Sequence, residues 1–141
     1  MSIKQLSVFL ENRRCSLLEP LQSLAGAGLN LSGLSLADTE QFGILRLVMK
    51  DWEQGRDLLQ RQGWVVKDND MVGVAVDDQP GGLVRTLEVL AAAGADIEYM
   101  YAFHLRHNGR AVLLFRVEAP AAAEAALAAA GISTVSAQQL Y

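Results

Sequence analysis

The spacing of apolar residues changes from a strand pattern to a helix pattern at the start of the chain. Apolar side chains lie two apart in residues 6–10, which predicts a half-buried strand. Leu17, Leu21 and Leu24 then lie at positions i, i+4 and i+7, the spacing of one helical face. The sequence therefore opens with a predicted strand and a predicted helix.

The ends of this helix carry their own signals. Ser16 is followed three residues later by Glu19, which predicts a capping box at the first turn. Gly28 predicts the end, because glycine adopts the left-handed conformation of a helix stop. The same kinds of pattern continue and predict strands at 31–36, 42–49, 64–66, 71–76, 96–106, 110–117 and 132–140, with helices at 52–61, 83–93 and 121–130.

Two halves of the chain repeat one another. A shift that carries Leu17 onto Leu83 preserves the apolar face of the helix. The coinciding residues are all apolar or small: Leu17, Leu21, Leu24, Ala25, Ala27 and Gly28 fall on Leu83, Leu87, Leu90, Ala91, Ala93 and Gly94. Since each half has the order βαββαβ, we predict an α+β fold of two tandem ferredoxin-like units with antiparallel sheets. The expected units are residues 1–68 and 69–141.

Composition and charge narrow the classes of function. Hydrophobic residues make up 51% of the chain and charged residues 20%, a balance that permits a buried core. The net charge of -4 argues against nucleic acid as a partner. No apolar run approaches the roughly 20 residues that cross a bilayer, so we expect no membrane partner. The single cysteine, Cys15, forms no internal disulfide and fits a reducing compartment, so we expect a cytoplasmic protein.

The segment between the strand at 71–76 and the helix at 83–93 carries the sharpest local signal. It reads Asp-Asp-Gln-Pro-Gly-Gly from Asp77 to Gly82. Proline fixes a backbone angle, glycine permits close approach of a ligand, and a helix start offers unpaired N–H groups with a partial positive charge. Such a loop favours a carboxylate or a phosphate, although a turn that needs Pro and Gly only for its shape explains the residues about as well.

Catalytic and metal-binding patterns are weak. His104 and His107 lack the further His or Cys that a metal site needs, so we expect no metal and no other cofactor. The sequence has no phosphate-binding GxxxxGK motif and no Ser-His-Asp arrangement with a nucleophile elbow. Cys15 has no neighbouring His or second Cys to activate it, so we interpret it as structural. We therefore predict no catalytic residue and no enzyme activity.

Two tyrosines lie at the start of a predicted strand. Alternate residues of a strand share a face, so Tyr99 and Tyr101 point to the same side. Such residues either line a pocket or pack in a core, and the pattern alone favours neither.

The motifs together resemble a known family. Each half has the order βαββαβ, and the second has D-x-P-G-x-L after its first strand, a helix ending in AAAGADI and a following hairpin; these features closely resemble the ACT domain, the amino-acid-sensing module of metabolic regulation. The segments QLSVFLEN, LNLSGLSLADTEQFGILRLV and IEYMYAF are similar to small bacterial proteins made of two ACT units without an attached enzyme. The resemblance implies a non-catalytic regulatory protein that binds an amino acid at an interface between ACT units.

The resemblance also implies site residues. In the family, the pocket forms where the loop after the first strand of one unit meets the second strand of a neighbouring unit. The implied ligand-binding residues come from both loops and both second strands: Asn12, Cys15, Asn30, Asp78, Pro80, Gly81, Asp96 and Ile97. The loop backbone holds the ligand carboxylate in this interpretation, and Asn12, Asp78 or Asp96 holds its ammonium group. The first unit has Arg14 and Cys15 where the second has Pro80 and Gly81, so we do not expect equal occupancy.

Partners follow from the same resemblance. A stand-alone module needs a partner or a second copy to report its state, so we expect a homodimer or a regulated metabolic enzyme as partner. A structural dimerisation module without ligand is an alternative, favoured by Arg14 and Cys15. An acylphosphatase-like enzyme is a weaker alternative, because the loop is acidic at Asp77 and Asp78 and the nearest arginine, Arg85, lies within the predicted helix.

Overall fold

The computed structural model describes residues 2–11, 15–38, 42–107 and 109–141. The chain divides into two compact units. The N-terminal unit comprises Lys4–Asn69, and the C-terminal unit comprises Asp70–Tyr141 together with Met1–Ile3. Both are mixed α+β units with antiparallel strand pairs and βαββαβ order, which confirms the predicted fold class.

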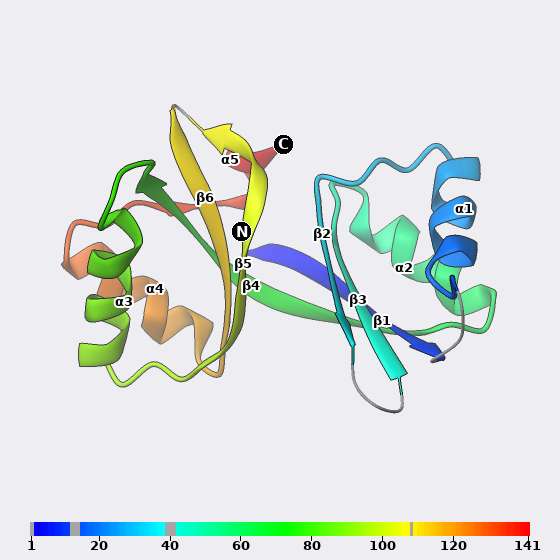
Figure 1. Cartoon of the computed structure of the whole chain (residues 1–141), viewed down its shortest axis with the longest axis horizontal. Coiled ribbons are helices and arrows are strands. Elements are labelled where there is room, and N and C mark those ends of the chain that lie inside the picture. The colour runs from blue at the N-terminus through cyan, green and yellow to red at the C-terminus, as the bar shows by residue number, and fades with distance from the viewer. Residues whose placement is uncertain (1, 12–14, 39–41, 108) are drawn as a thin grey trace. The chain divides into compact units, whose positions relative to one another are not determined.

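The N-terminal unit packs two helices against one face of its sheet (Figure 1). The strand order is β2-β3-β1-β4, and β3 pairs antiparallel with both β1 and β2. In chain order the elements are β1 (Ile3–Glu11), α1 (Leu18–Gly26), β2 (Gly33–Asp38), β3 (Phe42–Val48), α2 (Trp52–Arg61) and the first part of β4 (Val65–Asp77).

The C-terminal unit repeats this arrangement. Its strand order is β7-β4-β6-β5, and each of these pairs is antiparallel. After β4 the elements are α3 (Gly82–Ala92), β5 (Ile97–His107), β6 (Arg110–Val117), α4 (Pro120–Ala129), β7 (Thr134–Val135) and α5 (Ala137–Leu140). Figure 1 shows α3 and α4 on one side of β4 and β6.

Each unit has its own hydrophobic core between helices and sheet. In the N-terminal unit the fully buried Leu24 of α1 and Leu59 of α2 pack over β1 and β3. In the C-terminal unit Leu90 of α3 and Leu127 of α4 occupy the same roles over β4 and β6. The apolar face that repeats in the sequence is therefore the face that each unit buries.

Two elements have the predicted bounds, since α2 spans Trp52–Arg61 and β6 spans Arg110–Val117. The end of the first helix also follows its predicted glycine signal. Gly28 has φ of 73° just beyond α1, and the N–H of Leu29 donates to the carbonyl of Leu24 at 3.0 Å. This bond and the left-handed glycine form the expected helix stop.

Two predictions are wrong, one at the start of α1 and the other near residue 141. No side-chain capping bond occurs at α1, which begins at Leu18, because Ser16 lies in a turn before the helix. The predicted strand at 132–140 reaches only Thr134–Val135. A capping box between Ser136 and Gln139 instead starts the short helix α5, since each side chain bonds the backbone of the other.

The prediction of separate strands at 64–66 and 71–76 is also wrong, because β4 runs through residues 67–70 as one strand of 13 residues. Its polar side chains bond polar residues near the start of β1. Asp68 lies 3.5 Å from the ammonium of Lys4, and the hydroxyl of Ser2 donates to Asp70 at 2.6 Å. Paired polar side chains explain how a strand continues through a segment that contains no apolar residue.

Candidate functional site

The loop between β4 and α3 is held in shape by backbone bonds and by two glycines. The N–H of Gln79 donates to the carbonyl of Asp77 at 2.8 Å, and that of Gly82 donates to Gln79 at 3.1 Å. Gly81 has φ of 86°, in the left-handed region that favours glycine. At Gly82 a Cβ atom would clash with the carbonyl oxygen of Asp77. The two glycines are thus required for different reasons, one for conformation and one for space.

A cavity of about 290 Å³ lies beside this loop within the C-terminal unit. Its walls come from the end of β4, the loop, the first turn of α3, the start of β6 and the segment before β7. The lining residues are Ala75, Val76, Asp77, Gln79, Pro80, Gly81, Gly82, Arg85, Thr86, Arg110, Gly131, Ile132 and Ser133. Pockets for drug-sized ligands occupy about 300–1,000 Å³. The cavity therefore suits a molecule at the small end of this range.

Charged side chains of both signs line the cavity, with arginine in excess. Arg110 Nε lies 3.0 Å from Asp77 Oδ1, and both side chains are partly exposed. Arg85 Nη2 donates to the carbonyl oxygen of Ala130 at 2.8 Å, just beyond the end of α4. Asp77 is thus the single carboxylate facing two guanidinium groups in the described lining. The start of α3 adds the partial positive charge of a helix N-terminus.

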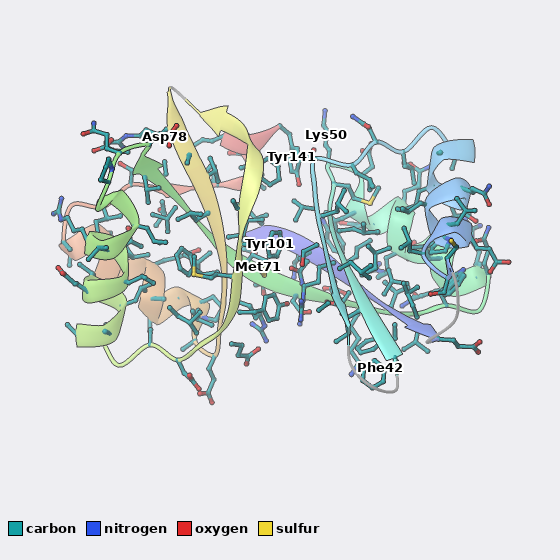
Figure 2. The ribbon with its side chains drawn as sticks, in the orientation of Figure 1. Phe42, Lys50, Met71, Asp78, Tyr101 and Tyr141 are labelled. Atoms are coloured by element: carbon teal, nitrogen blue, oxygen red, sulfur yellow. The ribbon has the colours of Figure 1, made fainter. Side chains whose placement is uncertain are left out.

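The predicted site residues of the C-terminal unit fall into two separate groups. Pro80 and Gly81 line the cavity. Asp78 lies in the same loop (Figure 2) and borders an adjoining hollow with Pro80. Asp96 and Ile97 follow the opposite end of α3, a helix of 11 residues and hence roughly 16 Å long. A small ligand that contacts the loop does not reach Asp96 within the same unit.

Two of the three site residues predicted in the N-terminal unit lie in the described part of the structure. Asn12 lies outside the described residues. Cys15 is exposed and has φ of 53°, a left-handed conformation that is uncommon for a residue other than glycine. Asn30 is exposed between α1 and β2. Cys15 and Asn30 stand before and after α1, at opposite ends of the helix, as Pro80 and Asp96 do for α3.

Eleven of the thirteen residues that line the cavity were not predicted as ligand contacts from the sequence, among them Arg85, Thr86, Arg110 and Ser133. Arg85 follows the loop by one helical turn, so the helical period places it near the mouth. Arg110 is brought there by strand pairing, since it lies opposite Asp77 in the register of β4 and β6. Local spacing carries no signal for that register, because Asp77 and Arg110 are 33 residues apart in the sequence.

The tyrosine pair takes the side of the sheet away from the core. Met100 packs against the core of the C-terminal unit. Tyr99 and Tyr101, one residue before and after it, therefore lie on the opposite face of β5. Neither residue lines the cavity beside the loop.

The described residues contain no group of three His, Cys, Asp or Glu side chains placed to hold a metal ion. Within the same residues, no helix is both long and apolar enough to cross a membrane.

The comparisons with known proteins agree with this fold. The sequence profile of the family described as an ACT domain pair matches residues 1–141. The chain belongs to the ACT domain pair family. No curated protein matches the sequence closely enough to count as a relative.

Solved structures share the fold of this ACT domain pair. Protein BT0572 from Bacteroides thetaiotaomicron is 35% identical, has a TM-score of 0.91, and the match covers 100% of this chain and 96% of that one. The ligand-free regulatory subunit of aspartate kinase from Thermus thermophilus is 16% identical with a TM-score of 0.65, over 92% and 93% of the chains. The corresponding subunit from Thermus flavus gives 18% and 0.62, over 93% and 94%. The likeness to the two kinase subunits is one of fold.

Proposed function

We propose that this ACT domain pair is a non-catalytic regulatory protein that binds an amino acid. The observation that carries the proposal is the cavity beside the Asp78–Gly81 loop, where a helix start and two arginines face a space of small-molecule size. Membership of the ACT family supports a ligand-sensing role. The regulatory subunits of aspartate kinase that share the fold support the regulatory part of the proposal.

The proposed ligand contacts keep the division into two groups of residues. The loop after the first strand contributes Asn12 and Cys15 in the N-terminal unit, and Asp78, Pro80 and Gly81 in the C-terminal unit. The start of the second strand contributes Asn30 in the N-terminal unit, and Asp96 and Ile97 in the C-terminal unit. Since one unit holds its two groups at opposite ends of a helix, a ligand that contacts both needs residues from two ACT units. We propose residues 1–68 and 69–141 as the two ACT units of the chain, and a homodimer or a regulated metabolic enzyme as the partner in the cytoplasm.

A thermal-shift screen against the twenty amino acids tests this function, because a ligand that binds only the folded protein raises its Tm. A ligand at a hundred times its Kd stabilises the folded state by about 2.7 kcal/mol, an effect of several degrees. We expect one amino acid or a small related group to produce such a shift. Absence of any shift at millimolar concentrations would remove the amino-acid ligand from the proposal.

A dimerisation module without ligand is a second candidate, favoured by an apolar strip on β2. Leu34 and Leu36 are 56% and 52% exposed and lie two residues apart on this edge strand. Exposed apolar edge strands invite pairing with another chain. Analytical ultracentrifugation of the wild type and of Leu34→Lys tests it. This candidate requires that the wild type dimerises, that Leu34→Lys weakens the dimer, and that no amino acid raises the Tm.

A further inference from the structure

The residues at the start of β1 belong to the C-terminal unit. Ser2 and Ile3 group with Asp70–Tyr141, whereas the rest of the strand groups with the N-terminal unit. The hydroxyl of Ser2 donates to Asp70 of β4 at 2.6 Å, and the side chain of Ile3 is fully buried. Ser2 and Ile3 thus pack in a different unit from the residues that follow them.

A glycine of β4 makes room for the side chain of Ile3. A Cβ atom at Gly73 would lie 2.6 Å from Cδ1 of Ile3 and 3.1 Å from the carbonyl oxygen of Val135. Carbon atoms that are not bonded pack at about 3.5–4.0 Å, so a larger residue at this position would push Ile3 or Val135 away. Val72 and Val74 belong to the core, so the contact over Gly73 lies on the face of the sheet away from α3 and α4. A glycine inside a strand often marks such a close approach.

The matched position of the N-terminal unit carries a side chain. The shift that carries Leu24 onto Leu90 places Ser7 at the position of Gly73. The hydroxyl of Ser7 accepts a hydrogen bond from Nε2 of Gln5 at 3.1 Å. The repeated pattern therefore does not require glycine at this position, and the space that Ile3 occupies belongs to the C-terminal unit.

The strand that pairs with β4 beside this contact is short. β7 consists of Thr134 and Val135, whereas strands contain about 5–6 residues on average. Just before β7, the carbonyl oxygen of Ser133 accepts a bond from the N–H of Ala75 at 3.3 Å. Ser133 also lines the cavity beside the loop. The contacts that hold β7 on β4 therefore also hold one wall of the cavity.

We propose that Ser2 and Ile3 form a strap that fastens β7 to β4 and so holds this wall of the cavity. The side chains of Ile3 and Val135 both lie over Gly73, and the bond from Ser2 to β4 keeps the strap in place. Because β1 continues from Ile3 into the N-terminal unit, the wall of the cavity depends on a strand of that unit.

Amide hydrogen exchange of the full chain in increasing urea, followed by NMR, tests the strap directly. Exchange through a local opening depends weakly on urea, because little surface is exposed, whereas exchange through unfolding of a whole unit depends on it strongly. In Ile3→Ala we expect the amide of Ala75 to exchange through a local opening, at least tenfold faster than in the wild type. Ile3→Val removes only Cδ1, the atom that meets Gly73, and should give a several-fold increase. The amides of α4 should keep the strong urea dependence of unfolding.

A double-mutant cycle tests the contact over Gly73. Gly73→Ala should lower the Tm, because the new Cβ atom meets Cδ1 of Ile3. In the Ile3→Val background that atom is gone, and we expect less than half of the loss. Gly43→Ala in β3 is the matched control, since a Cβ atom at that position would have its nearest neighbour at 3.7 Å. Its effect should be additive with Ile3→Val.

Either of two results would overturn the strap. One is an exchange rate at Ala75 that Ile3→Val and Ile3→Ala leave unchanged, or that depends on urea as strongly as the amides of α4. The other is additivity of Ile3→Val and Gly73→Ala in folded proteins. Ile3→Val keeps a branched apolar side chain and is expected to fold even if Ile3→Ala does not. Neither measurement needs a ligand, so failure of the amino-acid screen leaves the outcome unaffected.

Discussion

The N-terminal and C-terminal units bury the same helix face but surround the helix start with different residues. Leu24 and Leu90 are both fully buried at matched positions. Beside the start of α3 lie Arg85, Thr86 and Arg110, whereas the matched positions beside α1 hold Glu19, Pro20 and Phe42. The comparison teaches that the repeated apolar pattern specifies the fold, whereas the chemistry of the cavity depends on residues that differ between the two units.

The largest expected effect tests the equivalence of the two cores. Leu24→Ala and Leu90→Ala each remove a buried leucine, and we expect each to lower the free energy of unfolding by about 2–5 kcal/mol. Chemical denaturation measures both. Tryptophan fluorescence follows the N-terminal unit, because both tryptophans, Trp52 and Trp64, belong to it, and circular dichroism follows the whole chain. A cost below about 1 kcal/mol for either variant would contradict equivalent cores.

A smaller effect sharpens the difference at the helix start. Gly82→Ala forces a Cβ atom against the backbone carbonyl of Asp77, and we expect a loss of about 1–3 kcal/mol. The matched residue of the N-terminal unit is Ser16, so that position accepts a residue with a side chain. Gly26→Ala is the control, since a Cβ atom added at this position in α1 would have no neighbour within 4 Å. An equal effect of the two variants on Tm would refute the steric account.

The ion pair at the cavity mouth should add little stability. Arg110 and Asp77 are 42% and 58% exposed, and exposed pairs contribute about 0.2–1 kcal/mol. We expect Arg110→Gln to change the free energy of unfolding by no more than that, as measured by denaturation. A loss of several kcal/mol would show that the pair supports the fold of the C-terminal unit.

The smallest expected effect lies at alkaline pH and concerns the C-terminal unit, which contains all three tyrosines. Burial raises the pKa of Tyr141 to about 12, because the charged phenolate loses solvation. The folded state therefore holds this proton more tightly than the unfolded state. The resulting stability is present below about pH 10 and is lost as the pH rises toward about 12. Tyr141→Phe should remove the tyrosinate absorbance change near pH 12 and flatten the loss of stability.

Much of the fold was predictable because local patterns carried it. Some signals depend only on residues that are close in the sequence: the leucines of one helical face, the glycines after each helix and the Pro-Gly loop. For this reason α2, β6 and the loop at 78–81 occur where expected. The strand β4 was divided wrongly, because its polar middle is stabilised by side chains of β1 that are distant in sequence.

The candidate site was predictable only in part. Pro80 and Gly81 carry a local signal and line the cavity. Arg110 and Ser133 reach it through strand pairing and through the segment before β7, and neither contact follows from spacing along the chain. Thr86 has the pattern of an ordinary helix residue, since only the packed structure shows it buried beside an open space.

Calorimetric titration of the purified wild type and Asp78→Ala with the best amino acid of the thermal screen tests the central claim most directly. We predict saturable binding to the wild type and at least tenfold weaker binding to the variant, because a lost hydrogen bond to a charged group costs about 1.5–3 kcal/mol. Both proteins should keep the same secondary structure by circular dichroism. Equal affinity in the two proteins, or no binding heat from any amino acid, would contradict a ligand site at this loop.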